Sequence, residues 1–138
     1  MKGAVPAVRT VLARRYRCRG CRAVMSVVPR EIRARRHFGA GAIALALFVF
    51  GKLRATAVEA ASRAGSWARG GAGSWRLVRR WVEAVERGDL FPGVRASPPG
   101  WSPRQRAERI AMALAAHAPA TAGDSEEAAV VAGAALAR

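Results

Sequence analysis

Apolar and polar positions along the chain predict a mainly helical protein that begins with a small β-hairpin. From Val8 to Cys18, β-forming residues are mixed with arginines, and Ala23–Val28 is a second short apolar run. Between the two runs lies Cys18-Arg19-Gly20-Cys21. This order is typical of two antiparallel strands joined by a knuckle turn, and Pro29 then ends the second strand.

The most apolar stretch, Phe38–Leu53, predicts a buried helix. Its uninterrupted apolar part, residues 38–51, has 14 residues, which is shorter than the roughly 20 that cross a bilayer. Basic residues on both sides also suit a helix that lies in a membrane interface. Both interpretations of this segment stay open at the level of sequence.

Two shorter helices are predicted after this stretch, separated by a glycine-rich loop. Ala55–Ala64 has Thr56 as a candidate N-cap and Gly65 as its C-terminal stop. Residues 65–73 form a loop of nine residues, four of them glycine. The second helix is predicted over Ser74–Arg87, with Ser74 as N-cap and Gly88 just after its end.

The helix at Ser74–Arg87 is strongly amphipathic. At 100° per residue, one half-turn collects Trp75, Leu77, Val78, Trp81, Val82, Ala84 and Val85. The opposite sector collects Arg76, Arg79, Arg80, Glu83, Glu86 and Arg87. One face is therefore expected to pack in a core and the other to meet solvent or a partner.

Three regions of the chain follow from this pattern. Residues 88–103 hold four of the seven prolines and suggest a linker, and helices are predicted over Arg104–Ala118 and Glu126–Ala137. The predicted regions are a β-hairpin over residues 8–36, a helix-turn-helix-like three-helix core over 37–90, and a Pro-rich linker with an Ala-rich helical tail over 91–138.

Positive charge is concentrated in the first two thirds of the chain. Of the 24 basic residues, 22 are arginine, and the net charge is +15. Residues 1–36 carry a net +10, residues 37–95 a net +5, and residues 96–138 are neutral overall. Such a field attracts a polyanion to the N-terminal part, and arginine suits phosphate because its planar guanidinium donates two hydrogen bonds at once. A coding bias that raises Arg, Ala and Gly together also explains part of the excess.

The two cysteines, Cys18 and Cys21, have the spacing of half a zinc ribbon. Two intervening residues allow a knuckle to present both thiolates to one tetrahedral metal. Zinc takes four ligands, and besides these cysteines the chain offers His37 and His117, of which the first could supply at most a third. The alternatives are a metal-free hairpin with two reduced thiols and, less favoured, a metal shared by two chains; no bound cofactor is expected. Two such cysteines and the lack of a signal-peptide pattern predict a cytoplasmic protein.

The helices around the glycine-rich loop suggest the arrangement of a helix-turn-helix, in which the last helix enters the DNA major groove. DNA is the expected partner, whereas no small-molecule substrate is expected. The candidate DNA-binding residues are Arg35, Arg36, Arg69, Ser74, Arg76, Arg79 and Arg80. No phosphate-binding loop, nucleophile elbow or carboxylate set for two metals is present in the sequence, so no enzyme activity is expected.

Several short segments resemble a domain of unknown function in bacterial transposase-like proteins. They are Arg15-Tyr16-Arg17-Cys18-Arg19-Gly20-Cys21-Arg22, Val27-Val28-Pro29, Arg35-Arg36-His37-Phe38, the helix with Ile43, Leu45 and Leu47, and Trp75–Trp81. The resemblance covers roughly residues 8–90 and implies a zinc ribbon with two cysteine pairs followed by a helix-turn-helix. The first cysteine pair of that family is absent here, and no integrase-like catalytic domain follows Gly88. The resemblance therefore implies a truncated, non-catalytic relative that retains the DNA-binding role.

The leading hypothesis from the sequence is a DNA-binding module related to transposase N-terminal regions. In it, the Arg14–Arg22 hairpin adds phosphate contacts to those of the third helix. Two alternatives are a small basic protein that associates with membrane surfaces through Phe38–Leu53, and a non-functional transposase remnant.

Overall fold

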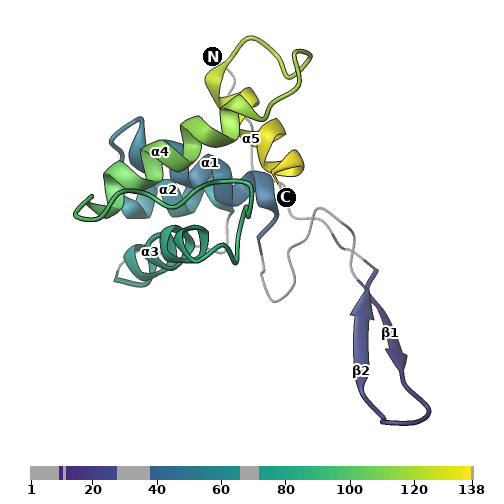
Figure 1. Ribbon diagram of the computed structural model, residues 1–138. Helices are drawn as coiled ribbons and strands as arrows, with labels where there is room; N and C mark the ends of the chain where they lie inside the picture. Colours follow the sequence, from purple (N-terminus) through teal and green to yellow (C-terminus); the bar gives the residue numbers. More distant parts are fainter. Residues whose placement is uncertain (1–9, 11, 28–37, 66–71, 138) are drawn as a thin grey trace.

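The computed structural model describes residues 10, 12–27, 38–65 and 72–137 (Figure 1). Within these residues, strands β1 (Arg14–Arg17) and β2 (Val24–Val27) precede five helices. The helices are α1 (Ala40–Gly51), α2 (Ala57–Ala64), α3 (Ala72–Glu86), α4 (Pro103–Ala116) and α5 (Glu126–Leu136). The predicted fold class is confirmed, since the protein is mainly helical with a small N-terminal hairpin.

The hairpin lies apart from the helices. β1 and β2 pair antiparallel, with Arg14 opposite Val27 and Arg17 opposite Val24. Every residue of the two strands is exposed, and the strands contact none of the five described helices (Figure 1). A hairpin of two strands is only marginally stable in water on its own. A partner that binds the hairpin therefore also stabilises its folded form.

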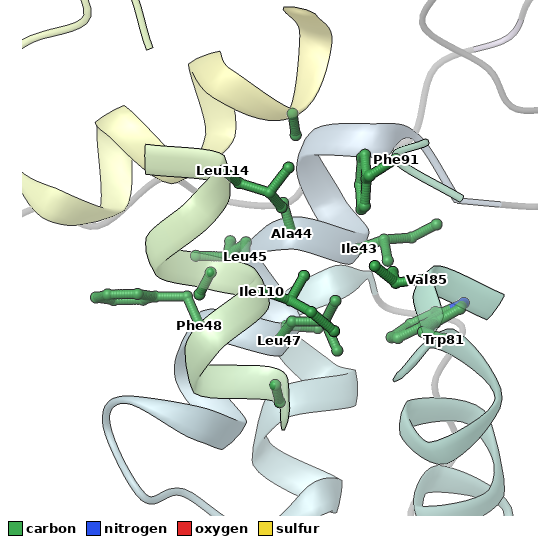
Figure 2. Close-up of a cluster of buried hydrophobic side chains, with 14 of the residues drawn as sticks. Ile43, Ala44, Leu45, Leu47, Phe48, Trp81, Val85, Phe91, Ile110 and Leu114 are labelled. Atoms are coloured by element: carbon green, nitrogen blue, oxygen red, sulfur yellow. The ribbon is translucent and has the colours of Figure 1, made fainter. Parts of the chain in front are cut away.

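α1 lies at the centre of the helical part and is covered on all sides. Its residues 43–51 are all buried, whichever side of the helix they occupy. α2, α4 and α5 pack against α1, and α3 contacts it over a smaller area. Figure 2 shows Ile43, Leu47 and Phe48 of α1 among side chains from neighbouring helices. A helix that is apolar all round suits this central position, because every face is buried by protein.

The core extends beyond the three helices predicted for it. Ile110 and Leu114 of α4 and Val130 of α5 are fully buried in the same cluster as α1. Described residues of the segment 91–138, predicted as a linker and tail, therefore pack in one core with described residues of the segment 38–90. Glycines allow this close approach. A Cβ at Gly133 would overlap the carbonyl oxygen of Leu114, and a Cβ at Gly51 would overlap the backbone of α4.

The connection between α3 and α4 also differs from the predicted linker. Leu90, Phe91 and Val94 are buried, although prolines surround them in the sequence. The Ser97 N–H and hydroxyl donate to the Glu86 carboxylate at 2.8 and 2.7 Å, which ties the connection to the end of α3. The proline-rich composition of residues 88–102 thus belongs to an ordered segment that covers the core.

The N-cap of α2 is the residue predicted from the sequence, although the helix begins at Ala57 rather than at Ala55. Thr56 is the N-cap, and its hydroxyl accepts a hydrogen bond from the Glu59 N–H at 3.2 Å. The Glu59 carboxylate in turn accepts from the Thr56 N–H at 2.7 Å, which completes a capping box. This backbone hydrogen bond, together with one from the Thr56 hydroxyl, lowers the pKa of Glu59. The stabilisation from the ionised carboxylate is present at neutral pH and is lost as the pH falls through the lowered pKa.

α3 has the two faces that its sequence predicts. Five residues of the apolar face are buried: Val78, Trp81, Val82, Ala84 and Val85. Trp75 departs from the prediction, because it lies at the edge of the core and is 41% exposed. The helix ends at Glu86, and Gly88 follows with a φ of 76°, the left-handed conformation expected just after a helix.

Trp81→Ala is expected to destabilise the fold by about 2 to 4 kcal/mol, because it removes a large buried side chain and leaves a cavity. Trp81 is 1% exposed and packs edge-to-face on Phe38 with ring centroids 5.2 Å apart. Thermal or urea unfolding would measure the loss. Trp75→Ala is the matched control, and we expect a smaller effect there. Equal losses at the two tryptophans would contradict the assigned faces of α3.

Candidate nucleic-acid interface

The hairpin is the most basic part of the described chain. Residues 12–27 contain five arginines and no acidic residue. The arginines are at positions 14, 15, 17, 19 and 22, and all five are exposed. Because no carboxylate lies on the hairpin to neutralise them, these guanidinium groups are open to an external anion.

The strand register divides the hairpin into two faces. Successive side chains of a strand point to opposite faces. Arg15 and Arg17 share one face with their partners Ser26 and Val24. On the other face, Tyr16 pairs with Met25, and these side chains are 53% and 65% exposed. One face is thus largely basic, and the other combines Arg14 with an exposed aromatic ring and aliphatic groups.

A tight turn at the tip of the hairpin holds the two cysteines. The Cys18 N–H donates to the Ala23 carbonyl at 2.8 Å, and the Arg22 N–H donates to the Cys18 carbonyl at 3.1 Å. Arg22 adopts a φ of 58°, in the left-handed region. Hydrogen bonds from the backbone N–H groups of Cys21 and Gly20, and from the Cys21 side chain, lower the pKa of Cys18. The knuckle predicted from the Cys-x-x-Cys spacing is therefore formed, and it favours a thiolate at Cys18.

The cysteines are two candidate ligands for a metal. Both are exposed and free of disulfides. Within the part of the chain that the structure describes, no group of three or more metal-ligating side chains lies together. His117 lies at the end of α4, where its Nδ1 is 2.7 Å from the Ala113 carbonyl oxygen. His37, the other histidine, falls outside the described residues.

The exposed face of α3 is the second candidate surface. Arg76, Arg79 and Arg80 are all exposed there, as the helical periodicity predicts. The Nε of Arg79 lies 2.8 Å from the Glu83 carboxylate, so this charge is already paired within the helix. Arg76 and Arg80 form no ion pair with any described residue, and they are the more available cations of this face.

The prediction that Ser74 is the N-cap of α3 is wrong. α3 begins at Ala72, so Ser74 lies within the first turns of the helix and is not its N-cap. Its side chain is only 2% exposed and therefore faces the core, away from a ligand. The predicted contacts Arg35, Arg36 and Arg69 fall outside the described residues. α2 and α3 do contact each other, but most of the loop that joins them also falls outside this range.

Several other arginines stabilise the fold. The Arg104 guanidinium donates to the Phe50 carbonyl at 2.7 Å and lies 4.4 Å from the centre of the Phe50 ring. Arg109 donates to the Arg95 carbonyl. Arg63 pairs with Glu127 at 3.5 Å and joins α2 to α5. These roles were not predicted, because the sequence pattern does not indicate which cations face carbonyls or acids from distant segments.

No family model, curated protein or solved structure matches this chain. Among the described residues, no helix has both the length and the apolar character needed to cross a membrane.

Proposed function

We propose that this protein is a non-catalytic DNA-binding module related to the N-terminal regions of bacterial transposases. The observation that carries the proposal is the hairpin, with five exposed arginines and no acidic residue over residues 12–27. The relation to transposases rests on the sequence resemblance alone. A DNA partner agrees with the cytoplasmic location expected from the sequence.

The balance of charge favours the hairpin as the first point of contact for a polyanion. The described helical residues, 38–65 and 72–137, carry 11 basic and 8 acidic residues. Most of these acids have basic partners nearby, so the field of the helical part is largely neutralised at short range. The hairpin arginines have no such compensation from any described residue, and phosphate contacts by arginine dominate the affinity of DNA-binding proteins.

The exposed face of α3 supplies a surface suited to duplex DNA. A helix with polar, cationic side chains fits the wide major groove of B-form DNA, whereas the deep and narrow major groove of RNA excludes it. Arg76 and Arg80 lie on this face without an ion pair among the described residues. DNA is therefore the preferred nucleic acid in this proposal.

The acidic residues support a non-catalytic role, because most of them have structural partners. Seven of the eight described acids accept hydrogen bonds or form ion pairs within the fold: Glu59, Glu83, Glu86, Asp89, Glu108, Glu126 and Glu127. Nucleases and transposases that use two metals need several carboxylates converging on one site. Among the described residues, the acids make separate contacts, and no three metal-ligating side chains lie together.

Two double variants test the proposal, and a third serves as the control. Arg15→Gln with Arg17→Gln, and Arg76→Gln with Arg80→Gln, are each expected to weaken binding to a short DNA duplex about 10- to 100-fold. Fluorescence anisotropy at low salt would measure the affinities. All four positions are exposed, so melting temperatures should stay close to that of the parent.

The matched control replaces the same number of charges elsewhere. Arg54 and Arg95 are exposed and lie outside both candidate surfaces. Arg54→Gln with Arg95→Gln should reduce affinity by no more than a few-fold. A hairpin variant that binds DNA as tightly as this control would contradict the proposed interface.

A further inference from the structure

The tip of the hairpin is a tight turn that carries both cysteines of the chain. Hydrogen bonds fix the turn at both ends, from Cys18 to Ala23 and from Arg22 to Cys18, at 2.8 and 3.1 Å. The left-handed conformation of Arg22, with a φ of 58°, reverses the chain directly after Cys21. Both thiols are exposed. A turn of this kind presents two sulfur ligands to one tetrahedral ion.

The described residues of one chain offer too few ligands for a complete site. Zinc takes four ligands in structural sites, and thiolates bind it strongly. The sequence contains no cysteine besides Cys18 and Cys21, and the described residues place no third metal-ligating side chain beside them. His117 belongs to α4, and the hairpin contacts none of the described helices. The described residues of one chain thus supply two of the four ligands, and a second chain can supply the other two.

We propose that two copies of this chain share one zinc ion, each supplying Cys18 and Cys21. The site then has four thiolates related by a two-fold axis, which is the commonest symmetry of homodimers. Binding of Zn²⁺ displaces the protons of the four thiols to solvent and forms four Zn–S bonds. This inference goes beyond DNA binding and does not depend on it.

The surroundings of the cysteines favour such a site. No described helix contacts the hairpin, so a second hairpin can approach the tip. Arg17, Arg19 and Arg22 line a shallow depression together with Cys18. A zinc ion with four thiolates carries two negative charges, which these guanidinium groups neutralise. The arginines thereby offset part of the repulsion between two basic hairpins.

The test is a metal titration of the reduced, full-length chain in the absence of DNA. Co²⁺ is the probe, because cobalt bound by four thiolates has characteristic absorption bands. We expect saturation at about half an equivalent of Co²⁺ per chain, consistent with one four-thiolate site per two chains. Sedimentation velocity with Zn²⁺ should show twice the mass of the 14.6 kDa chain. In a buffer that keeps the concentration of free Zn²⁺ constant, the fraction of chains that bind zinc should rise with protein concentration, because two chains form each site.

Variants of the four candidate ligands make the test specific. Cys18→Ser and Cys21→Ser should each abolish the dimer and the cobalt bands, while circular dichroism of the helices stays unchanged. His37→Ala and His117→Ala should leave stoichiometry and mass unaltered. Four outcomes would overturn the proposal: one metal per monomer, no binding at high protein concentration, a dimer that survives a chelator, or loss of binding in a histidine variant. None of them bears on DNA binding, which the arginine variants test separately.

Discussion

The Gly133→Ala variant is expected to be destabilised by about 3 to 5 kcal/mol, because the added methyl group has no space. A Cβ at this position would overlap the carbonyl oxygen of Leu114, and the Ala118 N would lie 3.2 Å from it. These neighbours are backbone atoms of the α4 region, so a change of side-chain rotamer cannot relieve the overlap. α4 and α5 would have to separate, and buried residues such as Val130 would lose contacts.

Gly73→Ala is the matched control for this prediction. Gly73 lies in α3, and a Cβ there would have no neighbour within 4 Å. Alanine is the better helix former, so this variant should be unchanged or stabilised by up to about 1 kcal/mol. Chemical unfolding followed by circular dichroism would compare the two variants. A Gly133→Ala protein as stable as the parent would contradict the close crossing of α4 and α5.

The affinity for DNA is expected to fall about 10²- to 10⁴-fold when the salt concentration rises from about 50 to 200 mM. This estimate assumes about five to eight phosphate contacts by arginine, each releasing close to one counterion. The five hairpin arginines, with Arg76 and Arg80, supply this number of exposed cations. DNA affinity is expected to depend steeply on salt because the proposed interface consists of charged groups rather than apolar surface.

Binding titrations with one duplex at four or more salt concentrations would give the slope of log affinity against log salt. Replacing Arg15 and Arg17 by glutamine should make this slope shallower by about 1 to 2, since each lost phosphate contact removes about one released ion. The Arg54 and Arg95 double variant should keep the parental slope. An affinity that does not change with salt would rule out the electrostatic interface.

Those elements whose signals are local were predictable from the sequence. The Thr56 and Glu59 pair forms the capping box at the start of α2, and Gly88 adopts a positive φ after α3. Both features depend on residues within one or two turns of each other. The apolar stretch that became α1 was predicted as buried because its pattern leaves no polar face.

The packing of α4 and α5 was harder to predict, because small residues give a weak sequence signal. Ala107, Ala111 and Ala134 bury little area each, yet all three are fully buried. They contribute by allowing backbones to approach, together with Gly51 and Gly133. The contribution of these small residues depends on the distance between helices that are far apart in the sequence. The sequence pattern therefore predicts only a linker and a helical tail for this part of the chain.

The sequence predicts only part of the candidate site. The Cys-x-x-Cys spacing indicated the knuckle, and the helical period placed Arg76 and Arg80 on an exposed face. The Ser74 prediction failed because α3 starts at Ala72, two residues before the predicted cap. The sequence also could not separate the available cations from those such as Arg104, which is bound to Phe50 by tertiary contacts.

The central position of α1 has a consequence for how the chain folds during its synthesis. α1 is the first described helix of the core to leave the ribosome. α5, which covers part of α1, begins about 75 residues after the end of α1. At a synthesis rate of about 5 to 20 residues per second, roughly 4 to 15 s pass between the synthesis of α1 and the start of α5. During that time α1, which is apolar on all sides, lacks some of the helices that bury it in the folded protein. We therefore expect the nascent chain to bind chaperones that recognise apolar segments, and slow translation to increase its aggregation.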